Sequence, residues 1–214
     1  CIQSGSSKNR GSIMTLATVA PPRSSAKHQV LLATAAAGSA ALMLMFGMLA
    51  IWMQLRDASP LRRSSNGSKM IHDWLPAEIK IPEVATNTIL ITLVMTCIIA
   101  QWAVYATRRS DSSHAYLALA IVAVLGIAAI NAQVAVYVQL GIGIRDGEYQ
   151  TLFYAITGTM TALLASGVVF SLVALFRALA GRLGDRQVMS AHALYWYVLT
   201  TAFCAMWFIV YVQK

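Results

Sequence analysis

Residues 115–140 read AYLALAIVAVLGIAAINAQVAVYVQL and include no Asp, Glu, Lys, Arg or His. A helix rises 1.5 Å per residue, so about 20 apolar residues are enough to cross the roughly 30 Å hydrocarbon core of a bilayer. This stretch is 26 residues long. It therefore predicts a transmembrane helix, and it sets the fold class for the rest of the chain.

Four further runs share this apolar character and also lack ionisable side chains. They cover residues 30–55, 87–105, 152–176 and 193–212. Several of their ends carry aromatic or basic residues of the kind that anchor helices at a membrane surface, such as Trp52 with Arg56. We predict an all-α membrane protein, in which a bundle of five transmembrane helices occupies residues 30–214.

The composition excludes most other classes of protein. Of the 214 residues 58% are hydrophobic and 11% are charged, whereas ordinary soluble domains are about 25% charged. A soluble enzyme, a disordered tail and a nucleic-acid module all need more charge in contact with water. The formal net charge of +8 comes from short segments between the apolar runs, where membrane orientation accounts for it without a nucleic acid. The three cysteines have neither zinc-site nor disulfide-framework spacing.

Residues 1–29 are rich in Ser, Ala and Pro and contain four basic residues but no acidic one. Such a segment cannot bury a core, and we interpret it as a flexible cytoplasmic arm. The chain begins with Cys1, which is either a mature lipoprotein cysteine or the result of an upstream start or fragment whose true initiator is Met14. We favour the second interpretation, because a lipidated Cys1 would lie outside the membrane.

The distribution of basic residues predicts the orientation. The links 106–114 and 177–192 carry two and three arginines, whereas the short link 141–151 on the other side carries Arg145 alone. Since basic residues favour the cytoplasmic side, we predict the N-terminus inside and the C-terminus outside. Residues 56–86 then form an external loop. Its prolines prevent one long helix, and we expect a short interfacial stretch around Ile71–Trp74.

No ionisable residue lies inside the predicted helices, which disfavours a pump, a coupled transporter or a permease. The four histidines, His28, His72, His114 and His192, fall at the edges of runs or in loops. We interpret the ten methionines as apolar packing residues. The sequence therefore predicts no catalytic, cofactor-binding or metal-binding residue in this chain.

Small and polar residues inside the runs predict helix contacts. Gly158, Ala162 and Ser166 recur every four residues, and Thr88 begins a similar stripe of threonines. Small residues let helices approach closely, and the sequence leaves open whether the neighbouring helix belongs to this chain or to a partner. Three amides, those of Gln101, Asn131 and Gln133, are expected to be buried and to hydrogen-bond across helices.

Several motifs resemble subunit III of the haem–copper terminal oxidases, the cytochrome c oxidase subunit III family, in its shorter five-helix bacterial form. They are the stretch IPEVATNT at residues 81–88, F-Y-x-x-T-G at 153–158, and Tyr195, Trp196 and Tyr211 of the last helix. The similarity as a whole covers about residues 30–212. The resemblance implies an N-in, C-out orientation. The positions that carry it, expected to be scaffold and packing residues, are Pro82, Asn87, Thr88, Phe153, Tyr154, Thr157, Gly158, Tyr195, Trp196 and Tyr211.

The sequence departs from the family pattern where that pattern is ionisable. Ala41 replaces a glutamate, and Val136 takes the glutamate position of a glutamine-and-glutamate pair with Gln133. The T-G-x-H-x-x-H signature has Met160 and Leu163 in place of its histidines, and the W-H-x-x-D pattern has Tyr197 and Thr200. The resemblance thus implies a divergent subunit III without the usual intramembrane polar groups.

The implied function is that of a non-catalytic subunit of a bacterial respiratory oxidase in the plasma membrane. Haem and copper would belong to partner subunits, and the partners would be catalytic subunit I, other subunits of the oxidase and membrane lipids. Two alternatives remain open on the sequence. One is a subunit-III-like protein of a nitric oxide reductase, and the other is a stand-alone membrane scaffold or assembly protein.

Overall fold

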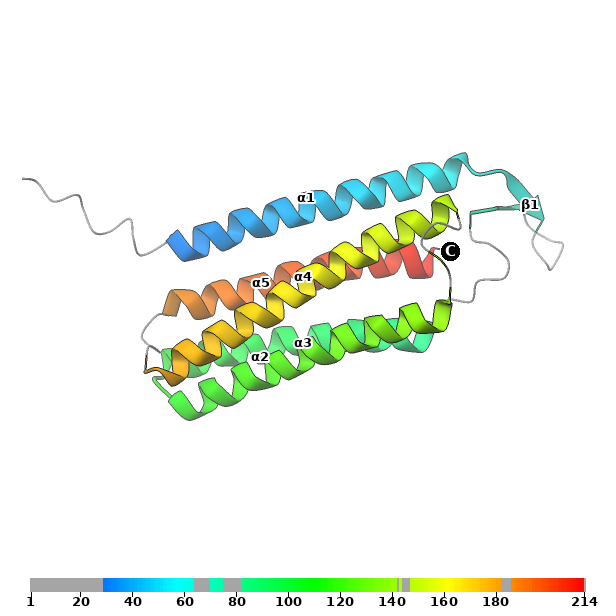
Figure 1. The fold of residues 1–214 in the computed structure, drawn as a ribbon. Coiled ribbons are helices and arrows are strands. Elements are labelled where there is room, and N and C mark those ends of the chain that lie inside the picture. Colours follow the sequence, from blue (N-terminus) through cyan, green and yellow to red (C-terminus); the bar gives the residue numbers. More distant parts are fainter. Residues whose placement is uncertain are drawn as a thin grey trace, which may run out of the picture.

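The structure is a computed structural model that describes residues 29–63, 70–74, 82–141, 143, 147–181 and 186–213. These residues contain five helices long and apolar enough to cross a membrane, which run along one another as a bundle (Figure 1). The helices are α1 (Gln29–Ala58), α2 (Glu83–Arg108), α3 (Ser112–Leu140), α4 (Glu148–Leu179) and α5 (Arg186–Met206). The predicted five-helix membrane protein is confirmed, whereas the predicted arm lies outside the described residues.

Every helix extends beyond the apolar run that predicted it. Helix α4 begins at Glu148 and has Arg177 in its last turn, and α2 begins at Glu83 and ends at Arg108. Acidic residues in the first turn and basic residues in the last turn interact favourably with the helix dipole. The apolar runs therefore missed polar turns at both ends of α1, α2 and α4 and at the beginning of α3 and α5.

Helix α5 is central to the packing. It contacts α1, α2 and α4, while α2 packs on α3 and α3 packs on α4. Helix α1 lies on the outside, since it contacts α5 and, to a smaller extent, α4, and buries only Gly38, Met45, Leu49 and Trp52. Beyond Met206, α5 continues as the π-helical turn η2 (Trp207–Val212).

The segment after α1 folds into a small hairpin, with strand β1 (Leu61–Arg63) pairing antiparallel with β2 (Met70–His72). Within the predicted interfacial stretch Ile71–Trp74, residues 71–72 belong to strand β2 and residues 73–74 form a turn. The backbone N–H of Asp73 donates to the carbonyl oxygen of Pro60 at 2.8 Å and closes the hairpin. Trp74 then follows within the turn.

An aromatic cluster fixes this hairpin to the bundle. The rings of Trp74 and Trp52 meet edge to face with centroids 5.3 Å apart, and Tyr149 lies 5.7 Å from Trp74. Such aromatic pairs stabilise the fold beyond the contribution of the apolar area that they bury. The hairpin is thereby held against the end of α1 and the beginning of α4.

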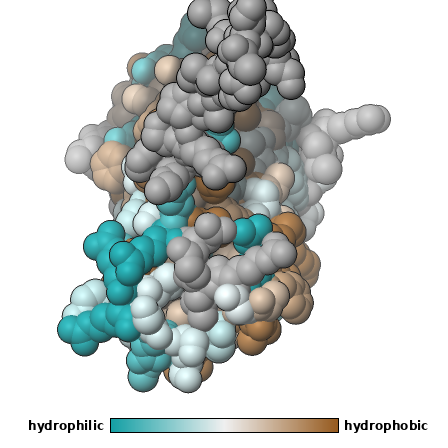
Figure 2. All heavy atoms as spheres, turned by 90° about the vertical axis from the view of Figure 1, so that its left-hand side faces the viewer, coloured by the Kyte–Doolittle hydropathy of each residue, from teal (hydrophilic) through white to brown (hydrophobic). Residues whose placement is uncertain are grey.

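The opposite end of the bundle is polar and carries the tight α2–α3 turn. Figure 2 shows hydrophilic residues gathered at this end beside an apolar flank. Asp111 caps α3, since its carboxylate accepts from the backbone N–H of His114 at 3.2 Å. This bond and the contact of the same carboxylate with the His114 ring lower the pKa of Asp111.

Close helix contacts occur at glycines other than the predicted one. A Cβ atom added to Gly126 would lie 2.7 Å from a methyl group of Val168, and one added to Gly167 would lie 3.0 Å from Leu199. Around Gly158 no atom of the structure lies within 4 Å of such a Cβ, and Ala162 is exposed. The small-residue face of α4 is therefore open around Gly158 and Ala162, whereas the hydroxyl of Ser166 contacts that of Tyr195 on α5.

These glycines give a matched test of the packing. Replacing either Gly126 or Gly158 by Ala improves helix propensity by up to about 1 kcal/mol. Gly126→Ala must also force apart α3, Val168 and Trp196, so we expect a net loss of about 1–3 kcal/mol in stability. Gly158→Ala should be neutral or stabilising. Thermal unfolding in detergent measures both, and equal effects of the two substitutions would contradict this packing.

Candidate functional site

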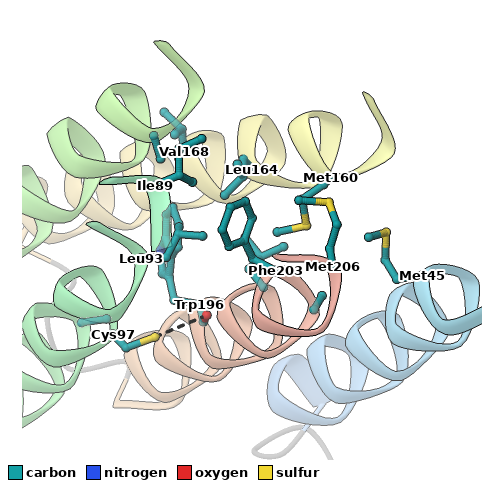
Figure 3. Close-up of a cluster of buried hydrophobic side chains, with 14 of the residues drawn as sticks. Met45, Ile89, Leu93, Cys97, Met160, Leu164, Val168, Trp196, Phe203 and Met206 are labelled. Carbon is teal, nitrogen blue, oxygen red and sulfur yellow. Dashed lines mark hydrogen bonds between the residues drawn. The ribbon is translucent and has the colours of Figure 1, made fainter. Parts of the chain in front are cut away.

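Trp196 is the side chain at which four helices meet. It is completely buried, and the tip of its indole ring lies against Gly126 of α3 and Gly167 of α4. From α2, the Cys97 thiol contacts the backbone carbonyl oxygen of Trp196 at 3.5 Å (Figure 3). A large ring fits at this crossing because the two neighbours have no Cβ atom. The residue is one of those that carry the family resemblance.

The indole N–H of Trp196 is satisfied by two buried side chains. It donates to Ser171 Oγ and to His192 Nε2, each at 3.1 Å. Because an indole N–H only donates, Nε2 is the acceptor in the contact with Trp196. Nδ1 of the same ring is buried and has no hydrogen-bond partner in the part of the chain that the structure describes. The Ser171 hydroxyl lies 2.8 Å from the same Nε2 and 2.9 Å from the carbonyl oxygen of Gly167. A polar network thus fastens α5 to α4.

The placement of His192 corrects the sequence analysis. The histidine was expected at the edge of an apolar run, yet it is completely buried inside the bundle, about 9 Å along α5 from its first residue. The missed signal is its spacing from Trp196, because residues four apart lie on one face of a helix. Within the described ranges no group of three or more His, Cys, Asp or Glu side chains could hold a metal ion.

A second polar contact joins α5 to α2 at the other end. The Trp207 indole N–H donates to Asn87 Oδ1 at 2.9 Å. Beside this pair lies a cavity of about 290 Å³, whose walls include Glu83 and Tyr211. Tyr211 is buried, and its ring lies 6.1 Å from that of Phe153. Three of the resemblance positions, from three helices, therefore converge at the π-helical turn.

The remaining resemblance positions lie apart from these two clusters. Pro82 is the N-cap of α2, and Thr88 and Thr157 return their hydroxyls to carbonyl oxygens one turn earlier, as expected for packing threonines. Tyr154 packs against Tyr137. Tyr195 donates to the carbonyl oxygen of Leu163 at 3.0 Å, which ties α5 to α4 once more.

The positions that depart from the family pattern are absorbed into the packing. Val136 and Met160 are buried in the apolar core, and Thr200 Oγ1 lies 3.0 Å from Cys97 Sγ. The Tyr197 hydroxyl donates to Gln101 Oε1 at 3.0 Å, which confirms the predicted hydrogen bond between helices for Gln101. Both side chains are exposed, so the predicted burial of Gln101 is wrong.

Two other amides differ from the prediction. Asn131 is exposed rather than buried, so that expectation is wrong. Gln133 is buried as expected, but its amide nitrogen finds no partner in the part of the chain that the structure describes.

Comparison with known sequences identifies the family. The profile of the family described as Cytochrome c oxidase subunit III matches residues 65–214. The chain belongs to this family. The match begins in the loop before α2 and runs through all of the last four helices, and it therefore includes both polar clusters of α5.

Individual relatives are distant. A probable cytochrome c oxidase subunit 3 of Rickettsia felis is 32% identical over 114 residues, which make up 50% of this chain and 40% of the relative. A probable cytochrome c oxidase subunit 3 of Rickettsia conorii is 28% identical over 149 residues, which make up 65% and 51%. The chain thus spans about half the length of the subunit III relatives that it matches.

The bond between Asn87 and Trp207 can be measured by a double-mutant cycle. Asn87→Ala removes the acceptor, and Trp207→Phe removes the donor while keeping an aromatic ring. We expect a coupling free energy of about 0.5–1.5 kcal/mol in thermal unfolding. Lipid offers neither the indole N–H nor the amide oxygen another hydrogen-bond partner. Effects that add to within about 0.3 kcal/mol would mean that the bond does not stabilise the bundle.

Proposed function

We propose that this chain is a non-catalytic, membrane-embedded subunit III of a bacterial haem–copper respiratory oxidase. The observation that carries the proposal is the match of residues 65–214 to the subunit III family. In this role the chain packs against the catalytic subunit and stabilises it during aerobic electron transport in the plasma membrane. The haem and copper centres reside in its partners.

The use of the polar side chains that lie between helices supports this role. Ser171, His192 and Trp196 bond to one another, and Asn87 bonds to Trp207. These hydrogen bonds hold helices together. In lipid, a polar group without its hydrogen-bond partner would destabilise the bundle. The bundle thereby gains a fixed shape, and a subunit that stabilises a neighbour by packing needs such a shape.

The outer surface supports it as well. Helix α1 exposes large apolar side chains along its length, among them Leu32, Met43, Leu44 and Phe46. Helix α4 exposes the small-residue face around Gly158 and Ala162, which a helix of another subunit could approach closely. Such surfaces face either lipid or another membrane protein, and a subunit of a larger complex uses both.

We also propose that the chain is oriented with the α2–α3 turn in the cytoplasm and the hairpin outside. Arg108, Arg109, Arg177 and Arg186 all lie at the end of the bundle that carries this turn. Basic residues concentrate on the cytoplasmic side of membrane proteins.

Purification from the native membrane tests the assignment. A tagged copy of the chain should co-purify, in stoichiometric amount, with a haem-containing catalytic subunit that reduces oxygen, while the isolated chain should show no haem absorption. Co-purification with an enzyme that reduces nitric oxide would instead assign it to that complex. Recovery without any haem protein would favour a stand-alone scaffold and contradict the proposal.

Cysteine labelling tests the orientation. In a Cys1→Ser background, Ala58→Cys near the hairpin should react with a membrane-impermeant maleimide in intact cells. Ser113→Cys, which is exposed at the start of α3, should react only after the membrane is opened. The reverse pattern would invert the proposed topology.

A further inference from the structure

A pocket at the hairpin end has no role in the contacts described above. It is a cavity of about 510 Å³ between the end of α1, the hairpin and the beginning of α4. Its walls include two acidic residues, Asp73 and Glu148, together with Trp74 and Gln150. Asp57 lies in the last turn of α1, next to the wall residues Ala58 and Ser59. The two charged residues of the pocket wall are thus both acidic, although Arg56 and the arginines of β1 lie near it in the chain.

Helix stability does not explain these acidic residues. Glu148 suits the beginning of α4, but Asp57 lies at the end of α1, where a negative charge opposes the helix dipole. Among the described residues Glu148 is exposed and forms no ion pair. A carboxylate in this position is available to a cationic group from outside the chain.

Trp74 supplies a second and independent indication of a ligand. The residue is only 9% exposed, lines the pocket, and its indole N–H has no hydrogen-bond partner in the described part of the chain. A buried donor without an acceptor is unfavourable, and its rarity in native structures calls for a missing partner. The pocket therefore combines an unpartnered donor, the indole N–H of Trp74, with the exposed carboxylate of Glu148.

Three kinds of occupant can be compared on this chemistry. A metal ion satisfies the carboxylates but offers no acceptor to an indole N–H. An amine-bearing lipid headgroup offers both, but its phosphate would be repelled by the acidic walls. A polypeptide segment offers a main-chain carbonyl oxygen for Trp74 and, on a lysine or arginine side chain, a cation for Glu148 without an added negative charge.

We propose that this acidic pocket binds a lysine- or arginine-bearing segment of a neighbouring subunit of the same complex. The inference rests on the proposed function, since it requires such a neighbour. The contact would lie at the membrane surface beside the hairpin, where it adds charge complementarity to the apolar packing of the helices. Complementary charge of this kind selects the correct partner and fixes its register.

Photo-crosslinking in the purified complex tests the proposal. Ala58, exposed on the pocket wall, is replaced by benzoylphenylalanine. Irradiation should join it to one stoichiometric membrane subunit, at a peptide that contains Lys or Arg. Glu148→Lys should reduce the yield of this adduct about threefold to tenfold and lower the salt concentration at which the chain dissociates.

Two further variants separate charge and hydrogen bonding from folding. Gln139→Lys adds positive charge at the same end of α3 but outside the pocket wall, and it should leave the adduct unchanged. Trp74→Phe keeps an aromatic ring against Trp52 and Tyr149 but removes the N–H donor, and it should reduce the adduct while the chain accumulates normally.

The outcomes distinguish this inference from the proposed function. A chain that does not co-purify with an oxidase contradicts the proposed function and, with it, the inference. A chain that co-purifies but crosslinks only to lipid or to a soluble protein, or whose adduct survives Glu148→Lys, overturns the inference alone. Loss of the adduct on chelation of divalent cations would assign the pocket to a metal ion and would also overturn it.

Discussion

The crossing at Trp196 is the contact on which the rest of the bundle depends. One indole ring lies against glycines of α3 and α4, its N–H is shared between Ser171 and His192, and its backbone carbonyl meets Cys97 of α2. In a bilayer the hydrophobic effect does not drive helices together. Their association depends instead on close van der Waals packing and on hydrogen bonds between helices. Trp196 supplies close packing and hydrogen bonds at one position. It thereby holds α5 at the centre of the bundle, and α1 packs on the outer side of α5.

The same principle explains why neutral residues are tolerated at the ionisable positions of the family pattern. Val136 and Met160 fill apolar space, whereas Thr200 and Tyr197 form neutral hydrogen bonds to Cys97 and Gln101. A charge at any of these places would need a partner that the surrounding helices lack, at a considerable free-energy cost. The helices are thus held by packing and neutral hydrogen bonds.

Much of this architecture could be predicted from the sequence, for physical reasons that also set the limit. Apolar length alone identifies five crossings, because the bilayer imposes one length scale on all of them. It cannot place His192, which lies inside α5 but outside the apolar run, nor distinguish the tightly packed Gly126 from the open Gly158. Those distinctions depend on which residues face each other across helices. The pairing of Met70–His72 as a strand likewise depends on the residues of β1 that it faces in the hairpin.

The central claim is that this chain stabilises a catalytic partner without taking part in its chemistry. The most direct measurement compares oxygen reduction by the purified complex with and without the chain, at equal haem content, over many turnovers. The account predicts nearly equal initial rates and a shorter active lifetime when the chain is missing, because the partner then loses a packed helical neighbour. An immediate fall in the initial rate, with the haem spectrum unchanged, would show that the chain supplies a group required for catalysis and would contradict the account.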